Sequence, residues 1–189
     1  MKELIEDEEF KGIDFSAKKF QHADYEYCNF IGCSFSGVDL SNLSFLECSF
    51  KDCDLTSAKI LSTSFKTVSF NSCKLLGLHF DHCNPFLLEM CFEHCQLDLS
   101  SFYQLSLKRT LFQSCSLKEV DFVESDLTEA QFNDCDLLGA IFENTNLTKA
   151  DFRTASDYNL DPTLNKVSKA MFSISGLPGL LNKYDIHIE

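Results

Sequence analysis

Large apolar residues occupy every fifth position along most of this chain. The first run of the series comprises Phe10, Phe15, Phe20, Tyr25, Phe30, Phe35, Leu40, Phe45, Phe50, Leu55, Ile60, Phe65, Phe70, Leu75 and Phe80. After a slip of two residues, the second run comprises Leu87, Phe92, Leu97, Phe102, Leu107, Phe112, Leu117, Phe122, Leu127, Phe132, Leu137, Phe142, Leu147 and Phe152. A period of five matches neither the 3.6 residues of a helical turn nor the alternation of a flat strand. Such self-similarity predicts a solenoid of stacked repeats.

A second constrained position lies two residues before each large residue. It mostly holds a small or medium side chain, as at Cys95, Ala130 and Ala150. The other three residues of each repeat are mostly polar. Two side chains in every five are therefore expected to point into the core, and three are expected to point outward.

This pattern resembles the pentapeptide-repeat family, whose motif is A(D/N)LXX. Matching stretches are Ala130-Gln131-Phe132, Ala150-Asp151-Phe152, Val38-Asp39-Leu40 and Ser125-Asp126-Leu127. The resemblance covers roughly residues 8 to 155. It implies an all-β fold, a right-handed quadrilateral β-helix with four pentapeptides in each coil.

Four repeats make twenty residues, so residues twenty apart should stack, with two more across the slip. One such column is Cys33, Cys53, Cys73, Cys95, Cys115 and Cys135. The slip is then an insertion of two residues, expected at Asn84-Pro85-Phe86 because proline cannot donate a ladder hydrogen bond. Coils spaced about 4.8 Å apart, seven or so in number, predict a rod on the order of 35 Å long.

Two regions are expected along the chain. Residues 1–157 form the β-helix, with a register break near 84–86, and residues 158–189 form a last partial coil with a capping and dimerisation helix and strand. The tail is rich in apolar side chains, which would close a two-fold dimer. The predicted dimerisation residues are Leu177, Leu180, Leu181, Tyr184, Ile186 and Ile188. The alternative is that this set only caps its own rod.

The ten cysteines are interpreted as core residues, because all but Cys91 fall on the small inward position. One group of histidines and cysteines has the composition of a metal site, but Cys83 and Cys95 are expected to point inward while its other members fall on outward positions. It consists of His79, His82, Cys83, Cys91, His94 and Cys95. No metal, cofactor or catalytic residue is predicted, since the chain has no nucleophile elbow and no phosphate-binding glycine loop.

The chain has no apolar run long enough to cross a membrane, and its acidic start, MKELIEDEEF, lacks the apolar region of a signal peptide. A cytoplasmic location without membrane binding is the expectation.

The charge is strongly acidic, with 16 basic against 29 acidic residues and a net charge of −13. Between residues 119 and 151, nine acidic residues face Lys149 alone. They are Glu119, Asp121, Glu124, Asp126, Glu129, Asp134, Asp136, Glu143 and Asp151. Direct binding to nucleic acid is not expected, because that affinity depends on Lys and Arg. The charge has two interpretations, simple solubility or an acidic face that imitates DNA and binds a DNA-binding protein.

The tail, with Asp161-Pro162 and Gly176-Leu177-Pro178-Gly179-Leu180-Leu181, resembles the ends of the Qnr quinolone-resistance proteins and of the microcin B17 immunity protein McbG. The resemblance implies a cytoplasmic homodimer, joined through its C-terminus, that protects DNA gyrase and topoisomerase IV from quinolones or a peptide toxin. The long projecting loops of some Qnr proteins have no counterpart here. The alternative is a non-catalytic scaffold that binds another protein.

Overall fold

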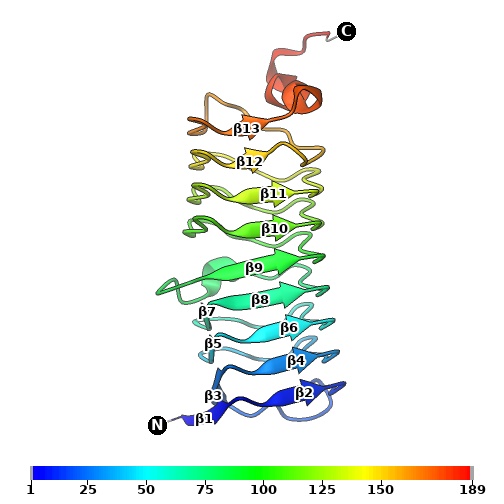
Figure 1. Cartoon of the computed structure of the whole chain (residues 1–189), viewed down its shortest axis with the longest axis vertical. Coiled ribbons are helices and arrows are strands. Elements are labelled where there is room, and N and C mark those ends of the chain that lie inside the picture. Colours follow the sequence, from blue (N-terminus) through cyan, green and yellow to red (C-terminus); the bar gives the residue numbers. More distant parts are fainter. Residues whose placement is uncertain (1, 188–189) are drawn as a thin grey trace.

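The computed structural model describes residues 2–187 and has the predicted architecture, a right-handed quadrilateral β-helix that rises as a rod from the N-terminal to the C-terminal end (Figure 1). Paired strands of successive coils run parallel, as in the register of Phe10 with Phe30 and of Phe30 with Phe50. The solenoid predicted from the period of five is confirmed. No helix among the described residues is both long and apolar enough to span a membrane.

One face of the rod is a nine-stranded sheet with one strand from each coil, called here the sheet face. Its strands are β2 (Glu9–Lys11), β4 (Asn29–Ile31), β6 (Ser49–Lys51), β8 (Val68–Asn71), β9 (Met90–Glu93), β10 (Leu111–Gln113), β11 (Gln131–Asn133), β12 (Asp151–Phe152) and β13 (Met171–Phe172). At a strand spacing of about 4.8 Å, its eight coil-to-coil steps make a rod roughly 38 Å long, slightly longer than the sequence predicted.

The other faces follow in chain order. Parallel bridges such as Ser116 with Asp136 define the second face, and bridges such as Ser101 with Asp121 define the third. The fourth face begins as a four-stranded sheet and continues, beyond residue 88, as bridges such as Ser106 with Asp126. The strands of that sheet are β1 (Glu3–Glu6), β3 (Ala23–Glu26), β5 (Ser44–Leu46) and β7 (Ser64–Lys66).

The register break interrupts the fourth face after β7. Asn84 still follows the register of the coils before it, since its N–H donates to the Thr63 carbonyl. Across the break the offset is 22 residues, because Met90 pairs with Val68, and it returns to twenty in the next coil, where Phe92 pairs with Phe112. The two additional residues therefore lie between residues 84 and 90. Pro85, which has no N–H, begins the turn there.

One side chain at the break departs from the prediction. The series placed Leu87 inside, but Leu87 is 65 % exposed and has a φ of +57°. Leu88 is the residue that packs against the core. The cause is the turn itself, in which the Leu88 N–H donates to the Pro85 carbonyl and the Phe86 N–H donates to the Asn84 side chain. As a result of this turn, the side chain that points into the core comes one residue later in the sequence than the repeat predicts.

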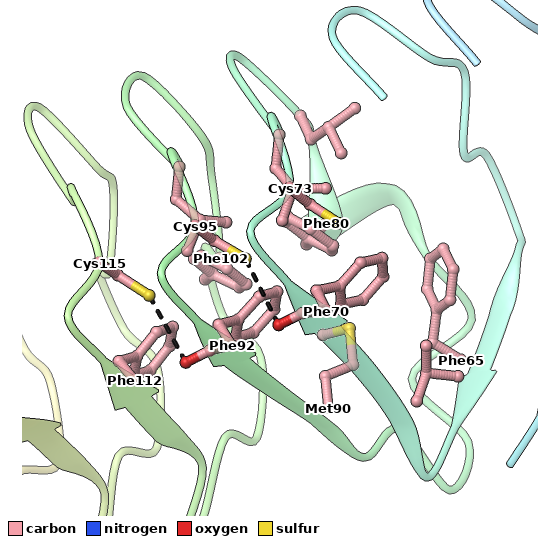
Figure 2. Packing of buried hydrophobic residues seen from close by; sticks show 14 of the residues in the cluster. Phe65, Phe70, Cys73, Phe80, Met90, Phe92, Cys95, Phe102, Phe112 and Cys115 are labelled. Atoms are coloured by element: carbon pink, nitrogen blue, oxygen red, sulfur yellow. Dashed lines mark hydrogen bonds between the residues drawn. The ribbon is translucent and has the colours of Figure 1, made fainter. Parts of the chain in front are cut away.

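The core consists of aromatic and cysteine columns. Phe92 stacks between Phe70 and Phe112, with ring centroids 5.4 and 5.2 Å away (Figure 2). The thiol of Cys95 donates to the Phe70 carbonyl of the coil before it, and the thiol of Cys115 repeats this contact with Phe92. Nine of the ten cysteines are buried free thiols and Cys91 is half-buried, which confirms the prediction.

Two short 3₁₀ helices cover the C-terminal end, η2 (Ile174–Leu180) and η3 (Asn182–Tyr184) (Figure 1). The Ser173 hydroxyl caps η2 by accepting from the Gly176 N–H, and the Leu160 N–H donates to the Gly179 carbonyl. Gly179 has to be glycine, because a Cβ there would lie 2.3 Å from the Tyr158 carbonyl. The expected helix is present, but residues 185–187 form no strand, and Ile188 lies outside the described residues.

A third 3₁₀ turn, η1 (Phe80–His82), lies on the third face in the coil just before the register break.

Candidate protein-binding surface

The acidic residues between positions 119 and 151 surround the rod. Asp151 pairs with Gln131 on the sheet face, and Asp136 pairs with Ser116 on the second face. Asp121 belongs to the third face. Asp126 belongs to the fourth face, in register with Ser106 and Asn146. A contiguous stretch of sequence thus becomes an acidic belt, because residues five apart lie on successive faces.

Four members of the belt lie at corners between faces, where the chain turns. Glu119, Glu124, Glu129 and Asp134 have φ values of +55°, +58°, +62° and +52°. The left-handed conformation recurs at every corner of these coils, and non-glycine residues adopt it at some cost. Three of the four side chains, those of Glu119, Glu124 and Asp134, are exposed.

Basic side chains neutralise four of the nine carboxylates. The Glu129 carboxylate lies 2.6 Å from Lys149 Nζ and 3.0 Å from Arg109 Nε, and these contacts hold its pKa below the ordinary value. Hydrogen bonds from Arg153 likewise lower the pKa of Asp151 against the opposing effect of burial. The other two pairs are Lys108 with Asp126 at 3.3 Å and Lys118 with Asp136 at 3.0 Å.

Most of these cations were outside the predicted acidic segment. Lys108, Arg109 and Lys118 precede residue 119 in the sequence, and each reaches a carboxylate 18 to 20 residues later. The coil length of twenty residues was the signal that could have identified these pairs.

The carboxylates without a cation gather mainly on the third face. The third-face patch is defined as Glu119, Asp121, Glu124 and Glu143, none of which has a salt bridge within residues 2–187. The Glu124 N–H donates to the Glu143 carbonyl at 2.8 Å, so the two residues lie next to each other on adjacent coils. The fifth carboxylate without a cation, that of Asp134, lies at the corner between the sheet face and the second face, where it accepts from Gln113.

Apolar side chains accompany the third-face patch. Ile141, the bridge partner of Asp121, is 45 % exposed. Tyr103 lies on the same face one coil earlier and is 37 % exposed. A surface of unpaired carboxylates with scattered apolar groups can bind a cationic protein surface, with charge steering the encounter and apolar contacts adding affinity.

The C-terminal apolar set is only partly exposed. Leu177, Tyr184 and Ile186 are exposed, whereas Leu180 and Leu181 are half-buried, with Leu180 packed against the core. Ile174, which was not predicted, is the most exposed large apolar side chain among residues 2–187, at 88 %. It follows Phe172 by two residues and lies outside the Leu-rich pattern of the tail.

A family model described as the pentapeptide repeat region matches residues 23–85 and 86–157, which is more than half of the chain. The protein belongs to the pentapeptide-repeat family, as its sequence pattern indicated.

Among solved structures, a trypsin-treated variant of QnrB1, described as a plasmid-mediated fluoroquinolone resistance protein, is similar over 98% of this chain and 100% of its own, with 20% identity and a TM-score of 0.50. A second trypsin-treated variant gives 20% identity and a TM-score of 0.50 over 99% of each chain. HetL, a pentapeptide repeat protein involved in heterocyst differentiation regulation in Nostoc sp. strain PCC 7120, gives 15% identity and a TM-score of 0.48 over 92% of this chain and 88% of its own. At this identity the QnrB1 likeness shows the fold. No curated protein sequence matches the chain.

Proposed function

We propose that this protein imitates DNA, binds a type II topoisomerase (DNA gyrase or topoisomerase IV) and protects it from quinolones or a peptide toxin. The observation that carries the proposal is the third-face patch, four carboxylates that have no salt bridge in the described part of the chain. The other acidic side chains in this region are mostly neutralised. The fold shared with QnrB1, which is described as a fluoroquinolone resistance protein, supports the choice of target.

The geometry of the patch supports mimicry of a phosphate backbone. DNA-binding surfaces place Lys and Arg along closely spaced phosphates. Here carboxylates come from two successive coils, about 4.8 Å apart, on a rigid scaffold. Since the β-helix coils hold the backbone that carries these side chains, little backbone conformational entropy is lost when a basic groove closes over them.

The mode of action is binding without catalysis, and it requires no cofactor. A topoisomerase target places the protein in the cytoplasm. Protection follows if the bound protein changes how the enzyme holds cleaved DNA or the poison.

The proposal includes a homodimer joined through the C-terminal end. Ile174, Leu177 and Tyr184 expose apolar side chains at this tip, and a two-fold contact would bury them. Replacing Ile174 and Leu177 with Asp should convert the dimer to a monomer in size-exclusion chromatography with light scattering. A wild-type protein that elutes as a monomer would contradict the proposed homodimer.

The binding test compares two variants of equal net charge. One carries Gln in place of Glu119, Glu124 and Glu143, and the control carries Gln in place of Glu8, Glu26 and Glu47, which lie near the N-terminal end of the rod. The third-face variant should bind gyrase about tenfold or more weakly than wild type, because its loss of charge lies at the contact.

The control should bind gyrase as wild type does, and it should also match the third-face variant in circular dichroism and thermal melting. Equal loss in both variants would contradict a specific third-face contact. Binding of neither gyrase nor topoisomerase IV by the wild type would favour the second function, a scaffold for another protein, which the repeat fold alone also permits.

A further inference from the structure

Two histidines and an aspartate converge on the third face, in the coil before the register break. Asp81 Oδ1 lies 3.3 Å from His79 Nδ1, and Asp81 Oδ2 lies 3.5 Å from His82 Nε2. One ligand atom from each of the three residues lies within 4.8 Å of the others. The two imidazole rings stack, with centroids 5.0 Å apart and an interplanar angle of 14°.

The local backbone explains this convergence. At the equivalent corners of the adjacent coils, Ser62 and Gln104 have φ values of +56° and +58°. At His82 the chain instead forms the 3₁₀ turn η1, in which the His82 N–H donates to the His79 carbonyl at 3.1 Å. Residues i and i+3 eclipse one another in a 3₁₀ turn, which places His82 over His79. The pair is therefore specific to this coil.

The spacing matches the edge of a tetrahedral metal site. Zinc bonds of about 2.0 to 2.1 Å in a tetrahedral arrangement place neighbouring ligand atoms roughly 3.3 Å apart. The distances from Asp81 to the two imidazole nitrogens are close to this value, but they end on different oxygens of the carboxylate. An ion bound through one Asp81 oxygen therefore requires this carboxylate to rotate toward the two imidazoles. The third edge, between the two imidazole nitrogens, is at most 4.8 Å long, and the two histidine side chains that would shorten it are 60 % and 56 % exposed.

The carboxylate is the fixed member of the cluster. The Asp81 side chain is only 16 % exposed, and its backbone N–H donates to the Ser101 carbonyl of the next coil. A carboxylate held in this way provides one ligand on a fixed backbone. Because the two imidazoles are exposed, a fourth coordination position stays open to water.

We propose that His79, Asp81 and His82 form a binding site for one divalent first-row transition ion, with Zn²⁺ as the reference ligand and water completing the coordination. Two imidazole nitrogens and one carboxylate oxygen suit zinc, copper or nickel better than magnesium or calcium. The sequence had grouped these histidines with cysteines and predicted no metal. The structure instead buries Cys83 and Cys95 in the core, where their thiols face the carbonyls of Ile60 and Phe70.

The competing explanation is a surface cluster in which Asp81 only accepts hydrogen bonds from the imidazoles. The test is a calorimetric titration of the reduced, full-length protein with Zn²⁺. The site predicts saturable binding of one Zn²⁺ per chain. Replacement of His79 or His82 with Ala should weaken this binding at least about tenfold, since even the loss of a partner that only orients a ligand costs that much. His22→Ala, which removes an exposed histidine outside the cluster, leaves the affinity unchanged.

Copper supplies a second readout. The electron paramagnetic resonance spectrum of the Cu²⁺ complex should show two coordinated nitrogens in wild type and His22→Ala, and one in His79→Ala. Circular dichroism checks that each variant is folded. Absence of saturable Zn²⁺ binding overturns the proposal, and so does a Zn²⁺ affinity that His79→Ala leaves unchanged. Binding that survives in both histidine variants also overturns it, because the ion would then bind elsewhere, for example at Cys91.

Discussion

Single side chains in this protein are stabilised by contact with their counterparts one coil away. The Phe112 ring is fully buried and stacks on Phe92 and Phe132, with centroids 5.2 and 5.1 Å apart. Aromatic pairs of this kind contribute about 0.5 to 1.5 kcal/mol each beyond the burial of their area. Because the columns are continuous, removal of one ring leaves a gap between two others that the stiff coils can close only in part.

Replacement of Phe112 with Ala should lower the free energy of unfolding by about 3 to 5 kcal/mol, since it removes buried area and opens a cavity. The matched control is Phe86→Ala at the register break, where the ring is 67 % exposed and the expected change is within about 0.5 kcal/mol. Urea denaturation followed by circular dichroism measures both. Similar losses from the two substitutions would mean that the column does not determine stability.

Thiol reactivity tests the burial of the cysteines. Burial raises the pKa of the Cys48 thiol to about 12, so little thiolate forms near neutral pH. In the folded protein, a thiol reagent should label Cys91 alone and slowly, because Cys91 is half-buried and its pKa is also raised by burial. Mass spectrometry should find one label on the native chain and ten after unfolding. Native labelling that persists in Cys91→Ser would show that the core opens.

At the scale of elements, the repeat determines the register between coils, and irregular turns determine where side chains depart from it. The offset of twenty residues, and of 22 across the break, follows from the sequence period alone and is confirmed by the strand pairing. The choice of Leu88 over Leu87 as the core residue was not predictable, because it depends on the turn that begins at Pro85. The 3₁₀ turn that joins His79 to His82 was not predictable for the same reason.

The C-terminal cap is the element with the clearest pH dependence. Lys183 Nζ lies 2.7 Å from Asp161 Oδ1, and Thr163 also donates to this carboxylate. Hydrogen bonds from Lys183 and Thr163 lower the pKa of Asp161 from 3.8 to about 2. A carboxylate whose pKa is lower in the folded state stabilises that state above the unfolded pKa, and the contribution disappears as the pH falls through the folded value.

Lys183→Met should therefore lower the melting temperature at pH 6, and the difference from wild type should shrink between about pH 4 and pH 2. Thermal melts followed by circular dichroism across this range measure the effect, with Lys169→Met as an exposed control at the same end of the rod. A difference that is the same at pH 6 and pH 2 would show that Lys183 acts through another contact, for example its ammonium group over the Tyr184 ring.

At the scale of the whole molecule, the rod redistributes charge that the sequence presents as one segment. The sequence correctly predicted the family, the β-helix and the buried cysteines. It did not separate Glu119 and Glu124, which have no salt bridge among residues 2–187, from Glu129, which is held by Arg109 and Lys149. That distinction requires the stacking of one coil on another, so it belongs to the folded rod and not to local composition.

The central claim is protection of a type II topoisomerase, and a supercoiling assay tests it most directly. DNA gyrase from the source organism is titrated with the wild-type protein, with the third-face variant and with its N-terminal control, in the presence of a fluoroquinolone or microcin B17. Wild type and control should restore supercoiling, and the variant with Gln at positions 119, 124 and 143 should not. Supercoiling that stays blocked at every wild-type concentration, for both gyrase and topoisomerase IV, would contradict the proposed function.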